Sequence, residues 1–241
     1  MTEFCEQVNP RVLLEIRRKR TVPDMLRVQE SWLALPEKRA LIWLAERTPA
    51  GIGPDHLTVL GLAAQIGAGI LYALSSINRY ALLGVIGCLA INWLGDSLDG
   101  TLARVRQRQR PRYGFYVDHM VDSFGALALM AGLAWSGYMH PWIAIGLLVA
   151  FLMLSIQSYL ATHALGEFRI SFWRFGPTEL RLLLAIGNLA LLWRPMVHLG
   201  GHEFRLFDVG GVIGLAGMAV MVVFFTLQNA ARLYREERIS K

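Results

Sequence analysis

Long apolar stretches, separated by short polar or charged segments, fill most of the chain after residue 55. A helix needs about 20 predominantly apolar residues to cross the hydrocarbon core of a bilayer. Six stretches reach that length, and we expect each to form a transmembrane helix. They cover residues 56–77, 80–104, 114–139, 141–163, 179–199 and 209–233. The pattern predicts an all-α integral membrane protein with a six-span domain over residues 56–234 and a polar tail over residues 235–241.

The region before the first span, residues 1–55, is charged and predicts one amphipathic helix from Pro36 to Arg47. Ala40, Leu41 and Leu44 fall on one side of this helix. Its polar side carries the charged residues Glu37, Lys38, Arg39, Glu46 and Arg47. Such a helix can lie along a membrane surface or pack against the protein itself, and both interpretations stay open.

The composition agrees with a membrane protein, because only 17% of the residues are charged and 54% are hydrophobic. Soluble domains carry about a quarter charged residues. The formal charge of +6 does not indicate a nucleic-acid partner, since the basic residues lie beside apolar spans, where anionic lipid head groups are nearer.

The distribution of basic residues predicts the orientation in the membrane. With six spans, all of the 24 lysines and arginines except Arg79, Arg194 and Arg205 fall on one side. Positively charged loops remain in the cytoplasm. We therefore expect a multi-pass protein with both termini, and the connection between the second and third spans, on the cytoplasmic side.

Four aspartates stand out within the spans. Asp96 and Asp99 lie near the end of the second span, and Asp118 and Asp122 near the start of the third. The spacings i, i+3 and i, i+4 place each pair on one helical face. Carboxylates at membrane depth are costly and by default mark a functional site. A bound cation makes such a cluster tolerable, and oxygen donors suit Mg²⁺ or Mn²⁺, with room for two ions.

The cluster also has other interpretations. A buried salt-bridge network would need more cations than the one nearby arginine, Arg104, provides. A divalent-ion transporter is the alternative from a different class, together with a non-catalytic membrane protein. Transport carboxylates tend towards the bilayer midplane, whereas these lie at one end of their spans.

The motif around the aspartates reads D-x-x-D-G-x-x-A-R over residues 96–104, then nine residues, then G-x-x-x-D-x-x-x-D over residues 114–122. It resembles the signature of the CDP-alcohol phosphotransferase (CDP-alcohol phosphatidyltransferase) family, with every fixed position filled and a long spacer. Six spans, cytoplasmic termini, an N-terminal surface helix and the opening Pro54–Thr58 also look like the family. Asp55 stands where the family more often has asparagine.

The resemblance implies a reaction in which an acceptor hydroxyl attacks a CDP-linked alcohol, CMP is released and a phosphodiester lipid forms. It implies that the four aspartates hold the metal ions. The small residues of the motif, Gly100, Ala103 and Gly114, leave room for phosphate. The guanidinium of Arg104 matches the geometry of phosphate oxygens. The expected substrate-binding residues are Gly100, Ala103, Arg104, Gly114 and Thr58.

The general base has two candidates. In much of the family it is the last aspartate, here Asp122. The run Asp118-His119-Met-Val-Asp122-Ser123 resembles the choline/ethanolamine phosphotransferase branch, which implies His119 assisted by Glu179. An imidazole oriented by a carboxylate is a good base near neutral pH. His119 could also be an interfacial polar residue, and Glu179 an ordinary residue of a helix first turn.

The same residues favour one substrate pair. His119, Ser123 and Glu179 favour transfer from a CDP-amino alcohol, of ethanolamine or choline type, to a diradylglycerol. The rival is transfer of phosphatidyl from CDP-diacylglycerol to glycerol phosphate, inositol phosphate or serine, with a basic acceptor pocket from Arg169, Arg174 and Arg181. The resemblance also suggests a homodimer, and the small-residue runs Gly61–Gly69 and Gly210–Gly217 permit close helix contact between or within chains.

Overall fold

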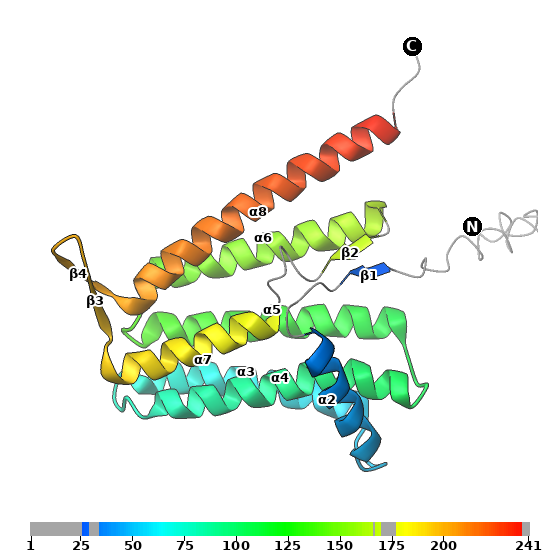
Figure 1. Ribbon diagram of the computed structural model, residues 1–241, viewed down its shortest axis with the longest axis horizontal. Coiled ribbons are helices and arrows are strands. Elements are labelled where there is room, and N and C mark those ends of the chain that lie inside the picture. The colour runs from blue at the N-terminus through cyan, green and yellow to red at the C-terminus, as the bar shows by residue number, and fades with distance from the viewer. Residues whose placement is uncertain (1–25, 29–33, 166, 170–176, 238–241) are drawn as a thin grey trace, which may run out of the picture.

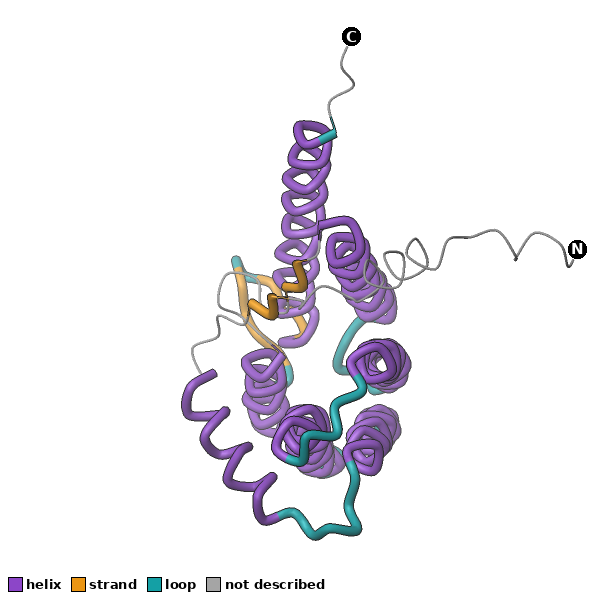
Figure 2. The backbone as a smooth tube through the Cα atoms, turned by 90° about the vertical axis from the view of Figure 1, so that its right-hand side faces the viewer, coloured by secondary structure: helices purple, strands orange, loops and turns teal. Residues whose placement is uncertain are grey.

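The structure is a computed structural model that describes residues 26–28, 34–165, 167–169 and 177–237 (Figure 1). Helices dominate the described part of the chain. They are α2 (Ala34–Arg47), α3 (Pro54–Ser75), α4 (Ala81–Val105), α5 (Pro111–Trp135), α6 (Pro141–Leu165), α7 (Pro177–Trp193) and α8 (Leu206–Glu236). Figure 2, a view from one end of the bundle, shows the long helices running side by side.

Five of these helices, α3, α4, α5, α6 and α8, are long and apolar enough to cross a membrane. Four helices begin at a proline, namely α3, α5, α6 and α7. Proline suits this position because its fixed backbone angle is helical and its missing N–H would be unpaired there anyway. For this reason α5 begins at Pro111, three residues before the expected start at Gly114.

The expected fifth span over residues 179–199 is wrong at its end, because α7 stops at Trp193. Pro195 disfavours a helical conformation at the residue before it. The chain continues as an antiparallel hairpin of β3 (Met196–Leu199) and β4 (His202–Arg205). With 17 residues, α7 is about 26 Å long, somewhat short of a bilayer core. That α7 crosses the membrane, as the fifth of six spans, stays a prediction.

A second short sheet also departs from the purely helical expectation. In it, β1 (Leu26–Val28) pairs in parallel with β2 (Glu167–Arg169). In Figure 1 the β3–β4 hairpin projects beyond one end of the helices, whereas β1 and β2 are drawn between α6 and α5.

Close contacts between glycines hold α3 against its two neighbours. A side chain at Gly132 of α5 would collide with the Gly69 backbone of α3, and one at Gly95 of α4 would lie 2.6 Å from the Leu57 carbonyl oxygen. Small residues let membrane helices approach to backbone contact. The small-residue run Gly61–Gly69 is therefore used within the chain.

A buried polar contact ties α7 to α3 deep in the bundle. The Asn188 amide donates hydrogen bonds to the Tyr72 hydroxyl, at 2.7 Å, and to the Leu184 carbonyl oxygen. Both Tyr72 and Asn188 are fully buried. Tyr72 belongs to the main apolar cluster, which also includes Ala68, Leu82, Val85, Leu89, Leu129 and Leu133.

The apolar side of α2 packs against the protein. Leu41 and Ala45 are buried against Leu57, Leu98 and Leu102 of α3 and α4. Figure 1 shows α2, in blue, lying obliquely to the long helices. Ala40, expected on the apolar side, is exposed, as is Trp43. Contact of α2 with a membrane surface stays a prediction.

Candidate active site

The four motif aspartates lie at one end of the bundle. Asp96 and Asp99 lie in the last turns of α4, and Asp118 and Asp122 in the second and third turns of α5. Consecutive antiparallel helices bring the end of α4 and the start of α5 to the same level. All four side chains are half-buried.

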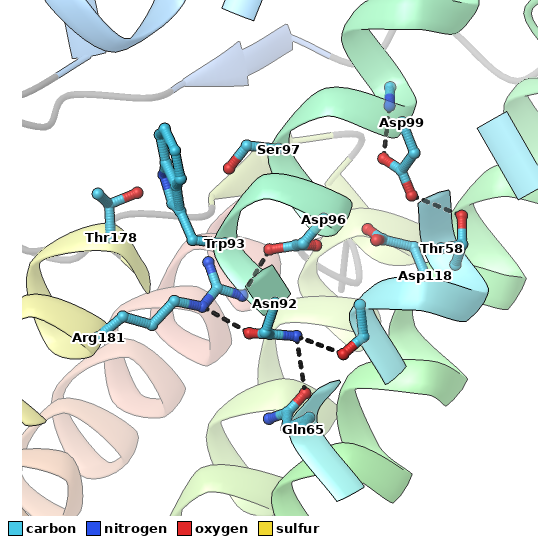
Figure 3. A network of polar contacts seen from close by, with 12 residues as sticks. Thr58, Gln65, Asn92, Trp93, Asp96, Ser97, Asp99, Asp118, Thr178 and Arg181 are labelled. Carbon is cyan, nitrogen blue, oxygen red and sulfur yellow. Dashed lines mark hydrogen bonds and ion pairs between the residues drawn. The ribbon is translucent and has the colours of Figure 1, made fainter. Parts of the chain in front are cut away.

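The carboxylates lie close enough to interact. Asp122 is within electrostatic range of Asp96, Asp99 and Asp118. In the view of Figure 3 the Asp118 carboxylate points into the space between Asp96 and Asp99. The fold therefore gathers the two predicted pairs into one acidic cluster, and each pair comes from one helical face.

Asp99 is held by α3 and by its own helix. The Thr58 hydroxyl donates a hydrogen bond of 2.6 Å to Asp99 Oδ2, and the backbone N–H of Gly100 donates to Oδ1 (Figure 3). Thr58, expected beside the nucleotide, thus directly contacts one of the expected metal ligands. These contacts fix the direction in which the Asp99 oxygens point.

A second arginine, Arg181 of α7, enters the acidic cluster. Its Nη2 lies 2.6 Å from Asp96 Oδ2, and its Nε donates to Asn92 Oδ1 at 2.8 Å (Figure 3). The Asn92 amide nitrogen in turn donates to the Gly61 carbonyl oxygen and to Gln65 Oε1 of α3. The premise that Arg104 is the one arginine near the cluster is therefore wrong.

The other expected substrate-binding residues lie along the end of α4 and the start of α5. Arg104 is exposed and donates a hydrogen bond of 3.0 Å to the Thr101 hydroxyl. A side chain at Gly100 would meet Arg104 at 3.7 Å, and one at Gly114 would meet open space. Ala103 is half-buried one residue before Arg104.

His119 lies between two aromatic rings. Its ring centroid is 4.3 Å from that of Phe115 and 4.6 Å from that of Tyr159 on α6. Its Nδ1 is 3.9 Å from Asp118 Oδ2. The Ser123 hydroxyl donates to the His119 carbonyl oxygen, so it serves the backbone of α5. The tight aromatic packing holds the imidazole in one orientation next to the acidic cluster.

The remaining candidates lie around the site or outside the described residues. Glu179 is half-buried in the first turn of α7, two residues before Arg181. Asp55 forms an ion pair with Arg110, on the connection between α4 and α5, and both side chains are exposed. Arg169 belongs to β2. Arg174 lies outside the described residues.

The donor set fits a divalent ion. Within the described residues, Asp118, His119 and Asp122 form a group whose ligand-type atoms all lie within 4.8 Å of one another. Asp96 and Asp99 add carboxylate oxygens from the facing helix. Carboxylate oxygens suit Mg²⁺ and Mn²⁺, and an imidazole nitrogen favours Mn²⁺ over Mg²⁺.

Residues 52–228 match the sequence model of the CDP-alcohol phosphatidyltransferases. The chain belongs to this family. The family and the helical membrane fold predicted from the sequence are confirmed. As a family member with five long apolar helices, it is an integral membrane protein.

Two curated proteins that are similar to this chain are named as different enzymes. A phosphatidylinositol phosphate synthase of Mycolicibacterium smegmatis is 31% identical over 119 residues, which are 48% of this chain and 51% of that protein. Cholinephosphotransferase 1 of Gallus gallus is 27% identical over 194 residues, which are 74% of this chain and 56% of that protein. The chain spans about half the length of each of these CDP-alcohol phosphatidyltransferase relatives.

The first testable prediction concerns Arg181. We expect Arg181→Met to lower the free energy of unfolding by about 1–3 kcal/mol, less than the full cost for a buried pair because both partners keep some solvent contact. Thermal unfolding in detergent with a chelator present measures this. The exposed Arg112→Met is the control, and Asp96→Asn added to Arg181→Met should recover part of the loss. Equal effects of Arg181→Met and Arg112→Met would contradict a stabilising ion pair between Arg181 and Asp96.

Proposed function

We propose that this CDP-alcohol phosphatidyltransferase family member is a phospholipid-synthesising transferase. It moves a phospho-alcohol from a CDP-alcohol to an acceptor hydroxyl and releases CMP. The observation that carries the proposal is the complete motif over residues 96–122, whose four aspartates lie together at one end of α4 and α5. The basic-residue distribution supports a cytoplasmic site.

In this proposal Asp96, Asp99, Asp118 and Asp122 hold Mg²⁺ or Mn²⁺, two ions in all. When bound, divalent ions neutralise a diphosphate and stabilise the charge on a departing phosphate. Arg104 binds the phosphate oxygens of the CDP group, and Gly100, Ala103 and Gly114 leave space for them. Thr58 orients Asp99 through their hydrogen bond.

The acceptor oxygen forms a bond to the phosphorus that carries the alcohol, and the bond from that phosphorus to CMP breaks. The proton of the acceptor hydroxyl passes to a general base, either Asp122 or His119 assisted by Glu179. The packing of His119 between Phe115 and Tyr159 supports its candidacy, because a fixed imidazole loses little freedom when it binds the hydroxyl.

The favoured substrates are a CDP-amino alcohol and a diradylglycerol. The similarity to the avian cholinephosphotransferase, which covers 74% of this chain, supports this pair. The similarity to the mycobacterial phosphatidylinositol phosphate synthase supports the rival, phosphatidyl transfer from CDP-diacylglycerol to a polar alcohol. Arg181, one of three arginines proposed for an acceptor phosphate, already contacts Asp96 and Asn92. That contact weakens the argument for the rival.

Purified protein should release CMP from labelled CDP-ethanolamine or CDP-choline when diacylglycerol and Mg²⁺ or Mn²⁺ are present. The parallel assay uses CDP-diacylglycerol with glycerol phosphate, inositol phosphate or serine. Activity with CDP-diacylglycerol alone would replace the favoured pair by its rival. Absence of CMP release from every pair would favour the transporter or non-catalytic alternative.

Asp99→Asn should reduce turnover by at least a hundredfold. Its carboxylate is a proposed metal ligand, and an amide lacks the negative charge that binds the ion. CMP release measures turnover, and thermal unfolding without metal should change little, because the amide still accepts the Thr58 hydrogen bond. Asp208→Asn, at the start of α8 on the opposite end of the bundle, is the control. Normal turnover of Asp99→Asn would remove Asp99 from the site.

His119→Ala should lower kcat by about 10²–10⁴-fold, the usual contribution of a general base. The measurement is the pH profile of kcat for this variant and for Asp122→Asn, with metal at saturation. An unchanged kcat in His119→Ala would return the role of base to Asp122.

A further inference from the structure

A carboxylate of the N-terminal helix reaches the two helices beside the active site. Glu37, in the first turn of α2, accepts hydrogen bonds through Oε1 from Trp93 Nε1 at 2.8 Å, the Thr178 hydroxyl at 3.0 Å and the Ser97 hydroxyl at 3.3 Å. Its other oxygen, Oε2, is shielded from solvent. One carboxylate group thus joins α2, α4 and α7.

The three donors flank proposed catalytic and metal-binding residues. Trp93 and Ser97 lie on α4 on either side of Asp96, and Thr178 directly precedes Glu179 on α7. Figure 3 shows Trp93, Ser97 and Thr178 around one space beside Asp96 and Arg181. The position of the Glu37 carboxylate therefore bears on the distance between the first turn of α7 and the acidic cluster.

The contact is strong enough to fix that distance. Hydrogen bonds to an ionised carboxylate are roughly twice as strong as neutral ones. A shielded carboxylate that lost its donors would remain as an unpaired charge, which is costly. Glu37 therefore favours the arrangement in which α4 and α7 present their donors together.

The attachment of α2 itself depends on other residues. Leu41 and Ala45 bury its apolar side against α3 and α4.

In α7, Thr178 and Arg181 both contact groups of other helices, and Glu179 lies between them in sequence. Glu37 and Asp96 thus hold the two ends of the segment that carries Glu179.

We propose that Glu37 is a positioning residue for the transferase reaction. Through Thr178, Trp93 and Ser97 it fixes the first turn of α7 against α4, and so sets where Glu179 and Arg181 lie relative to Asp96. This inference rests on the proposed function, because it assigns Glu37 an effect on that reaction.

The kinetic test uses Glu37→Ala in the full chain. We expect kcat to fall at least tenfold. KM for the CDP-alcohol should stay within twofold, because the residues proposed to bind the CDP-alcohol lie on α3, α4 and α5. Glu37→Gln, which keeps the accepting oxygen, should restore kcat to within threefold of the unmodified protein. Glu46→Ala, an exposed glutamate of the same helix, is the matched control and should change neither constant.

The structural readout does not depend on catalysis. Amide hydrogen exchange over residues 178–184 should become faster in Glu37→Ala, with exchange in α3 and α5 unchanged. Thr178→Val, which removes one donor with little change in shape, should have the same local effect and a smaller loss of kcat. If the unmodified protein releases no CMP, the proposed function fails, and the exchange result still tests the positioning by Glu37.

Three results would overturn the positioning role. They are unchanged exchange over residues 178–184, an unchanged kcat in Glu37→Ala, and a joint loss of kcat, KM and thermal stability that Glu37→Gln does not restore. The last result would mean that Glu37 only supports folding. Thr178→Val and Glu37→Gln keep the test decisive if Glu37→Ala does not fold.

Discussion

Electrostatic repulsion among carboxylates is the main constraint on the site between the end of α4 and the start of α5. Two like charges 4 Å apart repel by about 4 kcal/mol at an effective dielectric constant of 20. Four half-buried aspartates share this space. Their arrangement is tolerable because Arg181 contacts Asp96, Thr58 donates to Asp99, and the donor set suits divalent ions. The helices that supply these partners, α3 and α7, both pack against α4, as α2 does.

The features encoded by local periodicity were predictable from the sequence. The spacings of Asp96 with Asp99 and of Asp118 with Asp122 determine which helical face carries each pair, and antiparallel spans joined by a short connection bring the pairs to one level. Thr58 belongs to the opening of the first span, and its contact with the site follows from the close packing of α3 on α4. The long apolar stretches likewise identified the membrane helices.

The partners that come from distant segments were not predictable in this way. Arg181 and Asp96 are 85 positions apart, and Thr178 and Glu37 are 141 positions apart. No periodicity within one span indicates which face of α7 meets α4. Glu37 looked like one of several charged residues on the polar side of its helix. The end of α7 was missed because the apolar run continues beyond Trp193, although Pro195 marks the break.

The buried contact between Asn188 and Tyr72 attaches α7 to α3 at a distance from the acidic cluster. Thr178 is ten residues from Asn188 and lies about 15 Å from it along the helix axis. A tilt of α7 by about 6° about Asn188 would displace its first turn by roughly 1.6 Å, and errors of about 1 Å in a reacting geometry can cost a hundredfold in rate. Small angular changes about Asn188, deep in the helical bundle, are thus magnified at the first turn of α7, beside the acidic cluster.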